Sequence, residues 1–148
     1  MFSIQFLTPQ PSPPLHLPLY TATVSAGFPS PADDYLERSL DLNEYLVEHP
    51  AATFLARAEG DSMVEAGIHS GDLLVVDRSL EPRDDDIVVA VVNGESTVKR
   101  LCYRGDQPFL VPANPSYATI ALTDSFDVQI WGVVKFTIRH HRKPCSPW

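Results

Sequence analysis

Residues 86–101 read DIVVAVVNGESTVKRL and contain the clearest structural signal in the chain. Asn93 and Gly94 separate two apolar runs, and this pair favours a two-residue type I′ turn, because both central positions of that turn need a positive φ. With this turn, Val88 faces Lys99 across the hairpin. The turn alone sets this register, because residues 87–92 are apolar on both faces. The pattern therefore predicts a β-hairpin that places Lys99, together with Thr97, on an apolar face.

Further segments are equally rich in Val, Ile, Leu and aromatic residues, with turn residues between them. They span residues 53–58, 72–77, 108–112, 117–122 and 128–138. The segments are short and closely spaced, which leaves no room for the crossover helices that parallel strands require. The sequence therefore predicts a mostly β, antiparallel domain that is either barrel-like or built from paired sheets.

Proline dominates the N-terminal part of the chain, where five of the 14 prolines fall within residues 9–18, PQPSPPLHLP. Proline fixes φ and lacks a backbone N–H, so this stretch is excluded from helices and central strands. We expect an extended arm here. One short helix should follow in residues 41–50, DLNEYLVEHP, with Asp41 as N-cap, Glu44 completing a capping box and Pro50 as the stop.

These patterns divide the chain into three parts. Residues 1–40 are the extended N-terminal arm, residues 41–138 the β domain with the short helix at its start, and residues 139–148 a C-terminal tail. The tail contains the basic cluster RHHRK at 139–143. We interpret this cluster as a solvated end, with a weak contact to acidic partners or metal as the alternative.

Charge and composition argue against several classes of function. The formal net charge is −8, whereas nucleic-acid binding usually relies on a basic surface, so direct sequence-specific DNA binding is not expected. No apolar run approaches the roughly 18 residues of a membrane helix, and the N-terminus lacks the features of a secretory signal. We therefore expect a cytoplasmic protein without membrane association. Cys102 and Cys145 form no metal or redox motif, so no metal and no cofactor are predicted.

Ser62 lies in the loop-like sequence GDSM, residues 60–63. A hydroxyl in such a place is explained either by a turn or by a nucleophile. None of the five histidines is placed by a local motif as a base for Ser62. Lys99 can act as the base if it is neutral, which requires its pKa to fall by roughly three units from about 10.4, or ~4 kcal/mol. Burial on the apolar face of the hairpin can supply that change, so a Ser62–Lys99 pair is chemically coherent.

Several stretches together resemble the LexA/UmuD family of self-cleaving Ser–Lys peptidases. They are GDSM at 60–63, GIHSGDLLVVD at 67–77 and DDIVVAVVNGESTVKRL at 85–101. The separation of 37 positions between Ser62 and Lys99 agrees with the family spacing. Residues 26–54 and WGVV at 131–134 are similar to the UmuD branch, and the resemblance covers about residues 20–138.

The resemblance implies roles for particular residues. Ser62 corresponds to the nucleophile, Lys99 to the general base, and Ala26–Gly27 to the bond that the protein cuts in its own arm. The backbone N–H of Ser62 would help to stabilise the oxyanion. UmuD proteins can have cysteine at the position of Ala26, a difference that should leave cleavage intact.

The resemblance also implies partners and a biological role. UmuD-like proteins form homodimers and are cleaved on the RecA–single-stranded-DNA filament in the SOS response to DNA damage. The shortened form then joins a UmuC-like Y-family polymerase as the error-prone translesion polymerase of the polymerase V type. LexA-like repressors carry an N-terminal helix-turn-helix domain, for which the 26 residues before Gly27 are too few, so we expect the UmuD branch.

A different class of function stays open at this point. An acidic β domain could act as a non-catalytic interaction module that regulates a DNA polymerase or the RecA filament. Replacing Ser62 with alanine distinguishes the two hypotheses, because the substitution should change nothing in a module without chemistry.

Overall fold

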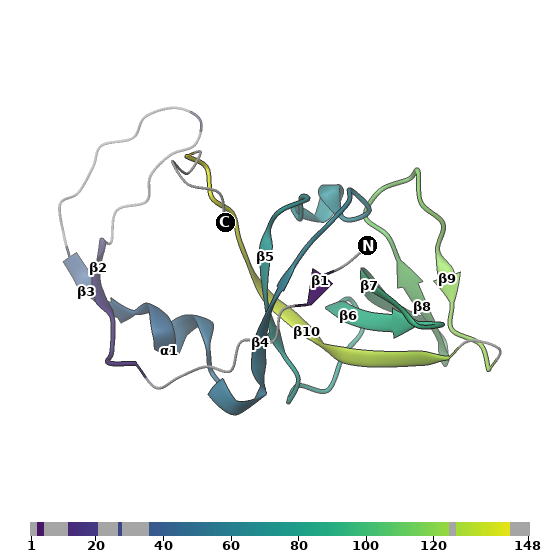
Figure 1. Cartoon of the computed structure of the whole chain (residues 1–148), viewed down its shortest axis with the longest axis horizontal. Coiled ribbons are helices and arrows are strands. Elements are labelled where there is room, and N and C mark those ends of the chain that lie inside the picture. Colours follow the sequence, from purple (N-terminus) through teal and green to yellow (C-terminus); the bar gives the residue numbers. More distant parts are fainter. Residues whose placement is uncertain (1–2, 5–11, 21–26, 28–35, 125–126, 143–148) are drawn as a thin grey trace. The chain divides into compact units, whose positions relative to one another are not determined.

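The computed structural model describes residues 3–4, 12–20, 27, 36–124 and 127–142 (Figure 1). The chain divides into two compact units. Met1–Pro9 and His49–Trp148 form the larger unit, and Gln10–Glu48 form the smaller one.

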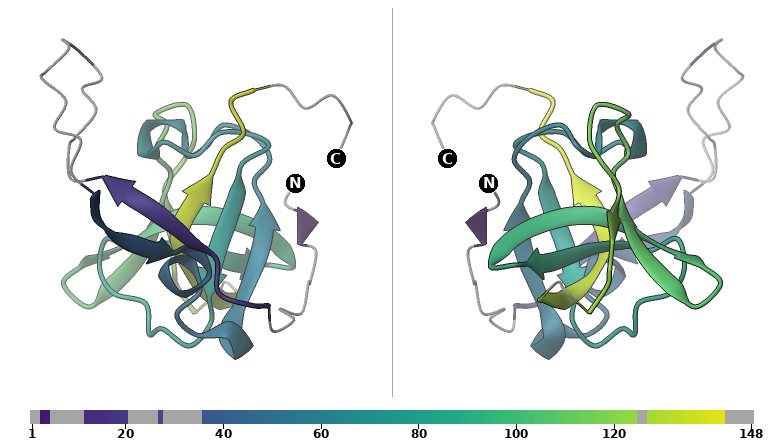
Figure 2. Two further views of the ribbon diagram at one scale, coloured as in Figure 1. Left: turned by 90° about the vertical axis from the view of Figure 1, so that its left-hand side faces the viewer. Right: turned by 90° about the vertical axis from the view of Figure 1, so that its right-hand side faces the viewer.

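An eight-stranded antiparallel sheet makes up the larger unit, in the spatial order β1-β4-β5-β10-β6-β7-β8-β9. In that order the strands span Ser3–Ile4, Thr53–Arg57, Leu73–Asp77, Val128–Ile138, Ile87–Val92, Glu95–Arg104, Gln107–Val111 and Ile120–Ala121. Figure 2 shows β6 and β7 running at a steep angle to β4 and β5, as in a strongly twisted sheet. The predicted mostly β, antiparallel architecture is confirmed. Among the described strands no ladder joins β1 to β9, so the sheet is open and not a closed barrel.

Strand β10 lies in the middle of this sheet and pairs with two neighbours (Figure 1). Its first half pairs with β6 and its second half with β5, with a register shift in each half. Gly132 permits the close approach of β5, because a Cβ atom at this position would lie 2.7 Å from Val76 Cγ1 and 2.9 Å from Asp77 O. A larger residue would therefore force the two strands apart.

The β6–β7 hairpin has the predicted turn and register. Asn93 and Gly94 have φ angles of 49° and 83°, the left-handed values that a type I′ turn needs. Val88 pairs with Lys99, as the turn predicted. The turn therefore determines which side chains of β7 share a face with Lys99, among them Thr97 two residues earlier.

Two clusters of buried apolar side chains form the core of the larger unit. One cluster contains Met63 and Ile68, which come from the loop between β4 and β5 and not from a strand. They are 3% and 4% exposed, respectively. This loop is therefore anchored in the core at two points.

The smaller unit contains a two-stranded antiparallel sheet, β2 (His16–Tyr20) with β3 (Leu36–Asp41), followed by α1 (Leu42–Leu46). Residues 16–20 and 36–40 of the predicted arm are thus extended, but they pair with each other. Asp41 caps α1 as predicted, because its Oδ1 accepts a hydrogen bond from the Asn43 N–H at 2.9 Å.

Helix α1 ends earlier than the sequence predicted. It stops at Leu46, and Pro50 opens the 3₁₀ helix η1 (Pro50–Ala52) instead of ending α1. Proline fits the first turn of a helix, where its missing N–H has no partner to lose. The two units divide after Glu48, and the predicted division after residues 40 and 138 stays a prediction. None of the helices in the described ranges is long and apolar enough to cross a membrane.

Candidate active site

Ser62 lies in the loop between β4 and β5, residues 58–72, called the Ser62 loop from here on. The two ends of the loop are bonded to each other. The Ala58 N–H donates to Asp72 O at 2.9 Å, and the Gly71 N–H donates to Ala58 O at 2.8 Å. A single 3₁₀ turn, η2 (Val64–Ala66), follows the serine. The hydroxyl is therefore carried by a closed and anchored loop, which suits a group that must be held in place.

Strand β7 brings Lys99 to the hydroxyl of Ser62. Lys99 Nζ lies 3.1 Å from Ser62 Oγ, 2.6 Å from Thr97 Oγ1 and 3.1 Å from Val98 O. Only 7% of the surface of Lys99 is exposed. The fold thus brings together the two residues that the sequence analysis selected, and it adds Thr97 as a direct neighbour of the amine.

The surroundings of Lys99 disfavour its charged form. Burial lowers the pKa of Lys99 below its ordinary value of 10.5, because desolvation raises the free energy of the ammonium group. Within the described part of the chain, no carboxylate forms an ion pair with Lys99. The cost of desolvation is therefore not offset by a counter-charge.

A neutral amine at Lys99 can form hydrogen bonds with all three of its neighbours. Its two N–H groups can donate to Thr97 Oγ1 and to Val98 O, which as a carbonyl oxygen can only accept. The lone pair then faces Ser62 Oγ, where it can accept the hydroxyl proton. This arrangement can activate a serine without a histidine.

Unpaired backbone donors lie at Ser62 and at its two neighbours in the chain. The N–H groups of Asp61, Ser62 and Met63 have no acceptor among the residues that the structure describes. Free, consecutive N–H groups beside a nucleophile are well suited to stabilise the negative oxygen of a tetrahedral intermediate.

A cavity of about 210 Å³ opens over the Ser62–Lys99 pair, and a second cavity of about 740 Å³ shares Ser96, Thr97, Lys99 and Tyr117 with it. Strand β8 pairs with β7 only from Arg100 onward. Among the described strands, residues 95–99 therefore pair with β6 alone. This free strand edge beside the hydroxyl can accept an extended peptide as an additional strand.

A family model described as Peptidase S24-like matches residues 18–135 of this chain. The chain belongs to the peptidase S24 family. Three relatives illustrate its place there. Protein SamA of Salmonella typhimurium strain LT2 is 51% identical over 125 residues, which cover 84% of this chain and 86% of SamA. Protein MucA of Escherichia coli is 46% identical over 126 residues, which cover 84% of this chain and 86% of MucA.

A third relative of this S24 family member is LexA repressor 2 of Pseudomonas syringae pv. tomato. It is 40% identical over 130 residues, which cover 88% of this chain and 64% of the repressor. These relatives confirm the resemblance to the LexA/UmuD family. The class of enzyme that they support is, in general terms, a self-cleaving serine peptidase.

Two histidines of the larger unit, His49 and His69, have other partners. His49 Nδ1 lies 2.7 Å from Asp77 Oδ2, and His69 Nδ1 lies 2.6 Å from Arg139 Nη2. Within the described ranges, the amine of Lys99 is the hydrogen-bonding partner of the Ser62 hydroxyl. The structure thus brings a lysine, and neither His49 nor His69, into contact with this hydroxyl.

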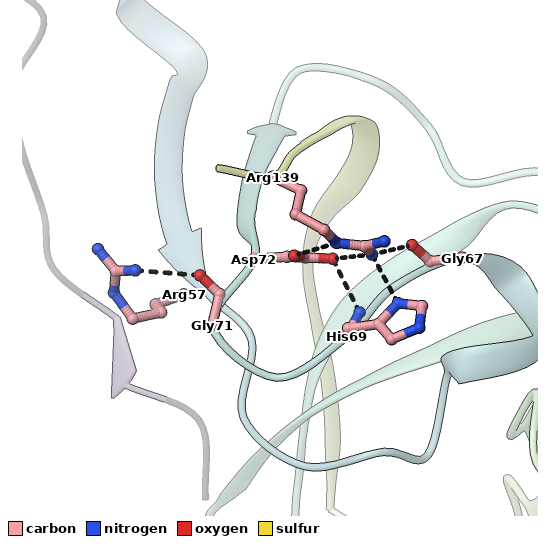
Figure 3. Close-up of polar contacts among 6 residues, drawn as sticks. All are labelled: Arg57, Gly67, His69, Gly71, Asp72 and Arg139. Atoms are coloured by element: carbon pink, nitrogen blue, oxygen red, sulfur yellow. Dashed lines mark hydrogen bonds and ion pairs between the residues drawn. The ribbon is translucent and has the colours of Figure 1, made fainter. Parts of the chain in front are cut away.

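Figure 3 shows that Arg139 holds the far end of the Ser62 loop. Arg139 Nε and Nη2 donate to the two carboxylate oxygens of Asp72 at 2.8 and 2.5 Å, and Nη2 also donates to Gly67 O at 2.7 Å. These hydrogen bonds from Arg139 hold the pKa of the buried Asp72 below its usual range. Arg139 opens the segment that the sequence analysis interpreted as a solvated tail. Its partner could not be foreseen, because Asp72 is 67 positions away.

The predicted cleavage site is only partly described. Ala26 lies outside the described residues, and Gly27 is described as a bend in the smaller unit. The assignment of the Ala26–Gly27 bond therefore stays a prediction. In the described part of the chain, no group of three or more His, Cys, Asp or Glu side chains could hold a metal ion.

Proposed function

We propose that this S24 family member cleaves its own chain between Ala26 and Gly27, with Ser62 as nucleophile and Lys99 as general base. The observation that carries the proposal is the 3.1 Å approach of the buried Lys99 Nζ to Ser62 Oγ. A buried lysine without a carboxylate partner destabilises a fold, whereas a lysine of lowered pKa is well suited to accept a proton.

The first chemical step forms an ester. The neutral amine of Lys99 accepts the proton of the Ser62 hydroxyl while Oγ attacks the carbonyl carbon of Ala26. The resulting oxyanion is stabilised by free backbone N–H groups, including that of Ser62. The C–N bond to Gly27 then breaks, and the ammonium of Lys99 returns its proton to the leaving amine of Gly27.

The second step hydrolyses the ester. Lys99, neutral again, accepts a proton from a water molecule that attacks the acyl carbon, and then returns this proton to Ser62 Oγ as the ester bond breaks. The products are a fragment of residues 1–26 with a new carboxylate and a shortened protein that begins at Gly27. The reaction needs no cofactor in this scheme.

The cleavage segment would bind as an extended strand along residues 95–99 of β7, beside the hydroxyl. The chain between Gly27 and Ser62 can extend by about 3.3 Å per residue, which allows the segment to reach its own site or that of a second copy. Small residues on both sides of the scissile bond suit a cavity of about 210 Å³.

The resemblance to UmuD supports a biological role for this reaction. We propose that the protein acts as a cytoplasmic homodimer in SOS mutagenesis. The RecA–single-stranded-DNA filament would stimulate cleavage by binding better to the state with the docked segment and the neutral lysine. The shortened form would then serve as a subunit of a translesion polymerase with a UmuC-like Y-family protein.

Intact mass spectrometry of the purified chain tests the chemistry. The wild type, Ser62→Ala and Lys99→Met are incubated between pH 7 and pH 10.5, and also at neutral pH with RecA, ATP and single-stranded DNA. We expect a fragment that begins at Gly27 from the wild type, formed faster at high pH or with the filament, because both conditions favour the neutral amine. Lys135→Met is the matched control, since it makes the same substitution on β10.

Two results would contradict the proposal. Cleavage by Lys99→Met at the wild-type rate would exclude the lysine as base. An intact wild-type chain under every condition would favour the non-catalytic interaction module instead.

A further inference from the structure

Residues 113–117, Ala-Asn-Pro-Ser-Tyr, lie between β8 and β9 and contact the Ser62 loop. Asn114 Nδ2 donates a hydrogen bond to Asp61 O at 2.9 Å, and the hydroxyl of Tyr117 donates to Asp61 Oδ1. Both contacts reach the residue directly before Ser62. One of them binds its backbone and the other its side chain.

The same segment also binds the residue directly after Ser62. The Ala113 N–H donates to Met63 Sδ at 3.3 Å, and the Glu65 N–H donates to Ala113 O at 2.9 Å. Met63 is itself buried in the core. Residues 113–117 therefore hold the loop on both sides of Ser62.

The contact from Asn114 determines the orientation of one particular peptide group. In a trans peptide the C=O and the N–H point in opposite directions from one rigid plane. Asp61 O and the Ser62 N–H belong to the same plane, so the hydrogen bond from Asn114 to this oxygen turns the Ser62 N–H away from Asn114. The Ser62 N–H has no acceptor among the described residues. In the proposed mechanism it donates a hydrogen bond to the oxyanion.

Asn114 is well suited to this task because two further hydrogen bonds hold the asparagine in place. Its Oδ1 accepts a hydrogen bond from the Ser116 N–H at 3.0 Å, and its backbone O accepts one from the Tyr117 N–H at 3.1 Å. These two bonds form a local turn that fixes the asparagine itself. Its Nδ2 is then free to bind Asp61 from a fixed position.

Tyr117 adds a second tie at the mouth of the site. Its side chain lines both cavities beside Lys99, although the residue is 44% exposed. The hydrogen bond to Asp61 raises the pKa of Tyr117 above its ordinary value of 10.0. The phenol therefore keeps its proton, and its hydrogen bond, to a higher pH than an ordinary tyrosine does.

We propose that Asn114 and Tyr117 are positioning residues of the reaction, which hold the Asp61–Ser62 peptide so that the hydroxyl and the N–H of Ser62 both face the scissile carbonyl. This inference rests on the proposed function of Ser62 and Lys99. Neither residue forms a hydrogen bond to Lys99, whose amine contacts Ser62, Thr97 and Val98. Their loss should therefore lower the rate of cleavage and leave unchanged the pH at which the lysine titrates.

Two substitutions in the full-length chain test this proposal. Asn114→Asp keeps the oxygen that accepts from Ser116 but loses the donor to Asp61, and Tyr117→Phe removes a single exposed hydroxyl. Tyr103→Phe is the matched control, because Tyr103 is 45% exposed and lies on β7. Cleavage rates are measured by intact mass between pH 7 and pH 10.5. In parallel, the rate at which a small fluorophosphonate labels Ser62 is measured.

We expect cleavage and labelling to fall together, by about 10- to 100-fold in Asn114→Asp and by about 3- to 10-fold in Tyr117→Phe. The pH midpoint should stay unchanged in Tyr117→Phe, which alters no charge. The label reports on Ser62 without docking of the arm. Normal labelling with slow cleavage would show that the two residues act on docking and would overturn the inference. Cleavage at the wild-type rate in both variants, or a shifted pH midpoint in Tyr117→Phe, would overturn it as well.

The two proposals can fail separately. If the wild type itself neither cleaves nor reacts with the fluorophosphonate, the proposed function fails before the variants are compared. If the wild type is active and both variants match it, only the positioning role fails. Should Asn114→Asp not fold, as judged by its thermal unfolding, Tyr117→Phe still decides, because it deletes one surface hydroxyl from an otherwise unchanged chain.

Discussion

Replacing Lys99 with methionine should stabilise the fold at neutral pH, and this gain should shrink as the pH rises. Methionine has a similar length and no charge, so it can occupy the buried position of Lys99 without the cost of desolvating an ammonium group. The comparison is best made between Ser62→Ala and the double variant Ser62→Ala/Lys99→Met, because neither protein can cleave itself during the measurement.

The sign and the size of the pH dependence follow from proton binding. Burial lowers the pKa of Lys99 in the folded state below the ordinary value of 10.5. Between the lowered pKa and 10.5, the unfolded chain keeps a proton that the folded chain has released, so the lysine protein becomes more stable as the pH rises. The difference in the free energy of unfolding between the methionine protein and the lysine protein should therefore shrink by up to about 1.4 kcal/mol per pH unit in this window. Below the window both states are protonated, and the gap is constant.

Other groups that titrate in the alkaline range do not disturb this comparison. Burial raises the pKa of the Cys102 thiol, and the hydrogen bond to Asp61 raises the pKa of Tyr117. Both contributions are common to the two proteins, and they cancel in the difference of their stabilities.

Urea unfolding at half-unit steps from pH 6.5 to pH 10.5, followed by tryptophan fluorescence, gives the two free energies of unfolding. A gap that stays constant over the whole range would mean that Lys99 titrates at its ordinary pKa. That result would refute the argument for a neutral base, whatever the distance between the two side chains.

Three further substitutions give separate tests. Thr97→Val removes one acceptor from Lys99 Nζ, so the rate of cleavage should fall about tenfold. The pH midpoint of cleavage should move down, because the Thr97 hydroxyl stabilises the ammonium form of Lys99 more than the amine. An unchanged pH profile would contradict this. Gly132→Ala should lower the free energy of unfolding by about 1–3 kcal/mol, since its Cβ would lie 2.7 Å from β5; urea unfolding with an unchanged midpoint would argue against this close approach. Arg139→Gln should lower the free energy of unfolding at pH 7, and should lower it by less at pH 3. Arg139 lowers the pKa of Asp72, so the ionised Asp72 stabilises the fold above about pH 4, and this stabilisation is lost as the pH falls through the lowered pKa. If Arg139→Gln lost the same free energy of unfolding at both pH values, the ionisation of Asp72 would not be coupled to Arg139.

Local signals in the sequence account for the elements that were predicted correctly. Asp41 caps α1 because its carboxylate can reach the otherwise unpaired N–H of Asn43, two residues later in the chain. The end of the same helix was misplaced, since Pro50 is compatible both with the end of one helix and with the start of the next. Where one signal fits two local structures, the surrounding fold decides between them.

The site was predicted less completely than the fold. Ser62 and Lys99 were selected because the family spacing added to what each residue suggested alone. Asn114, Tyr117 and Arg139 were missed, because their partners lie 53, 56 and 67 positions away in the chain. No periodicity or motif specifies such contacts, since they form only when loops from different strands pack together.

The sequence by itself determined the turn at Asn93–Gly94, and through it the register that places Lys99 opposite Val88. A two-residue turn has few allowed conformations, so local chemistry is sufficient there. Only the tertiary structure decided that the amine lies 3.1 Å from Ser62 Oγ and that its pKa is lowered. Both properties depend on the Ser62 loop packing over β7 and excluding water, and desolvation arises only when distant parts of the chain cover the same group.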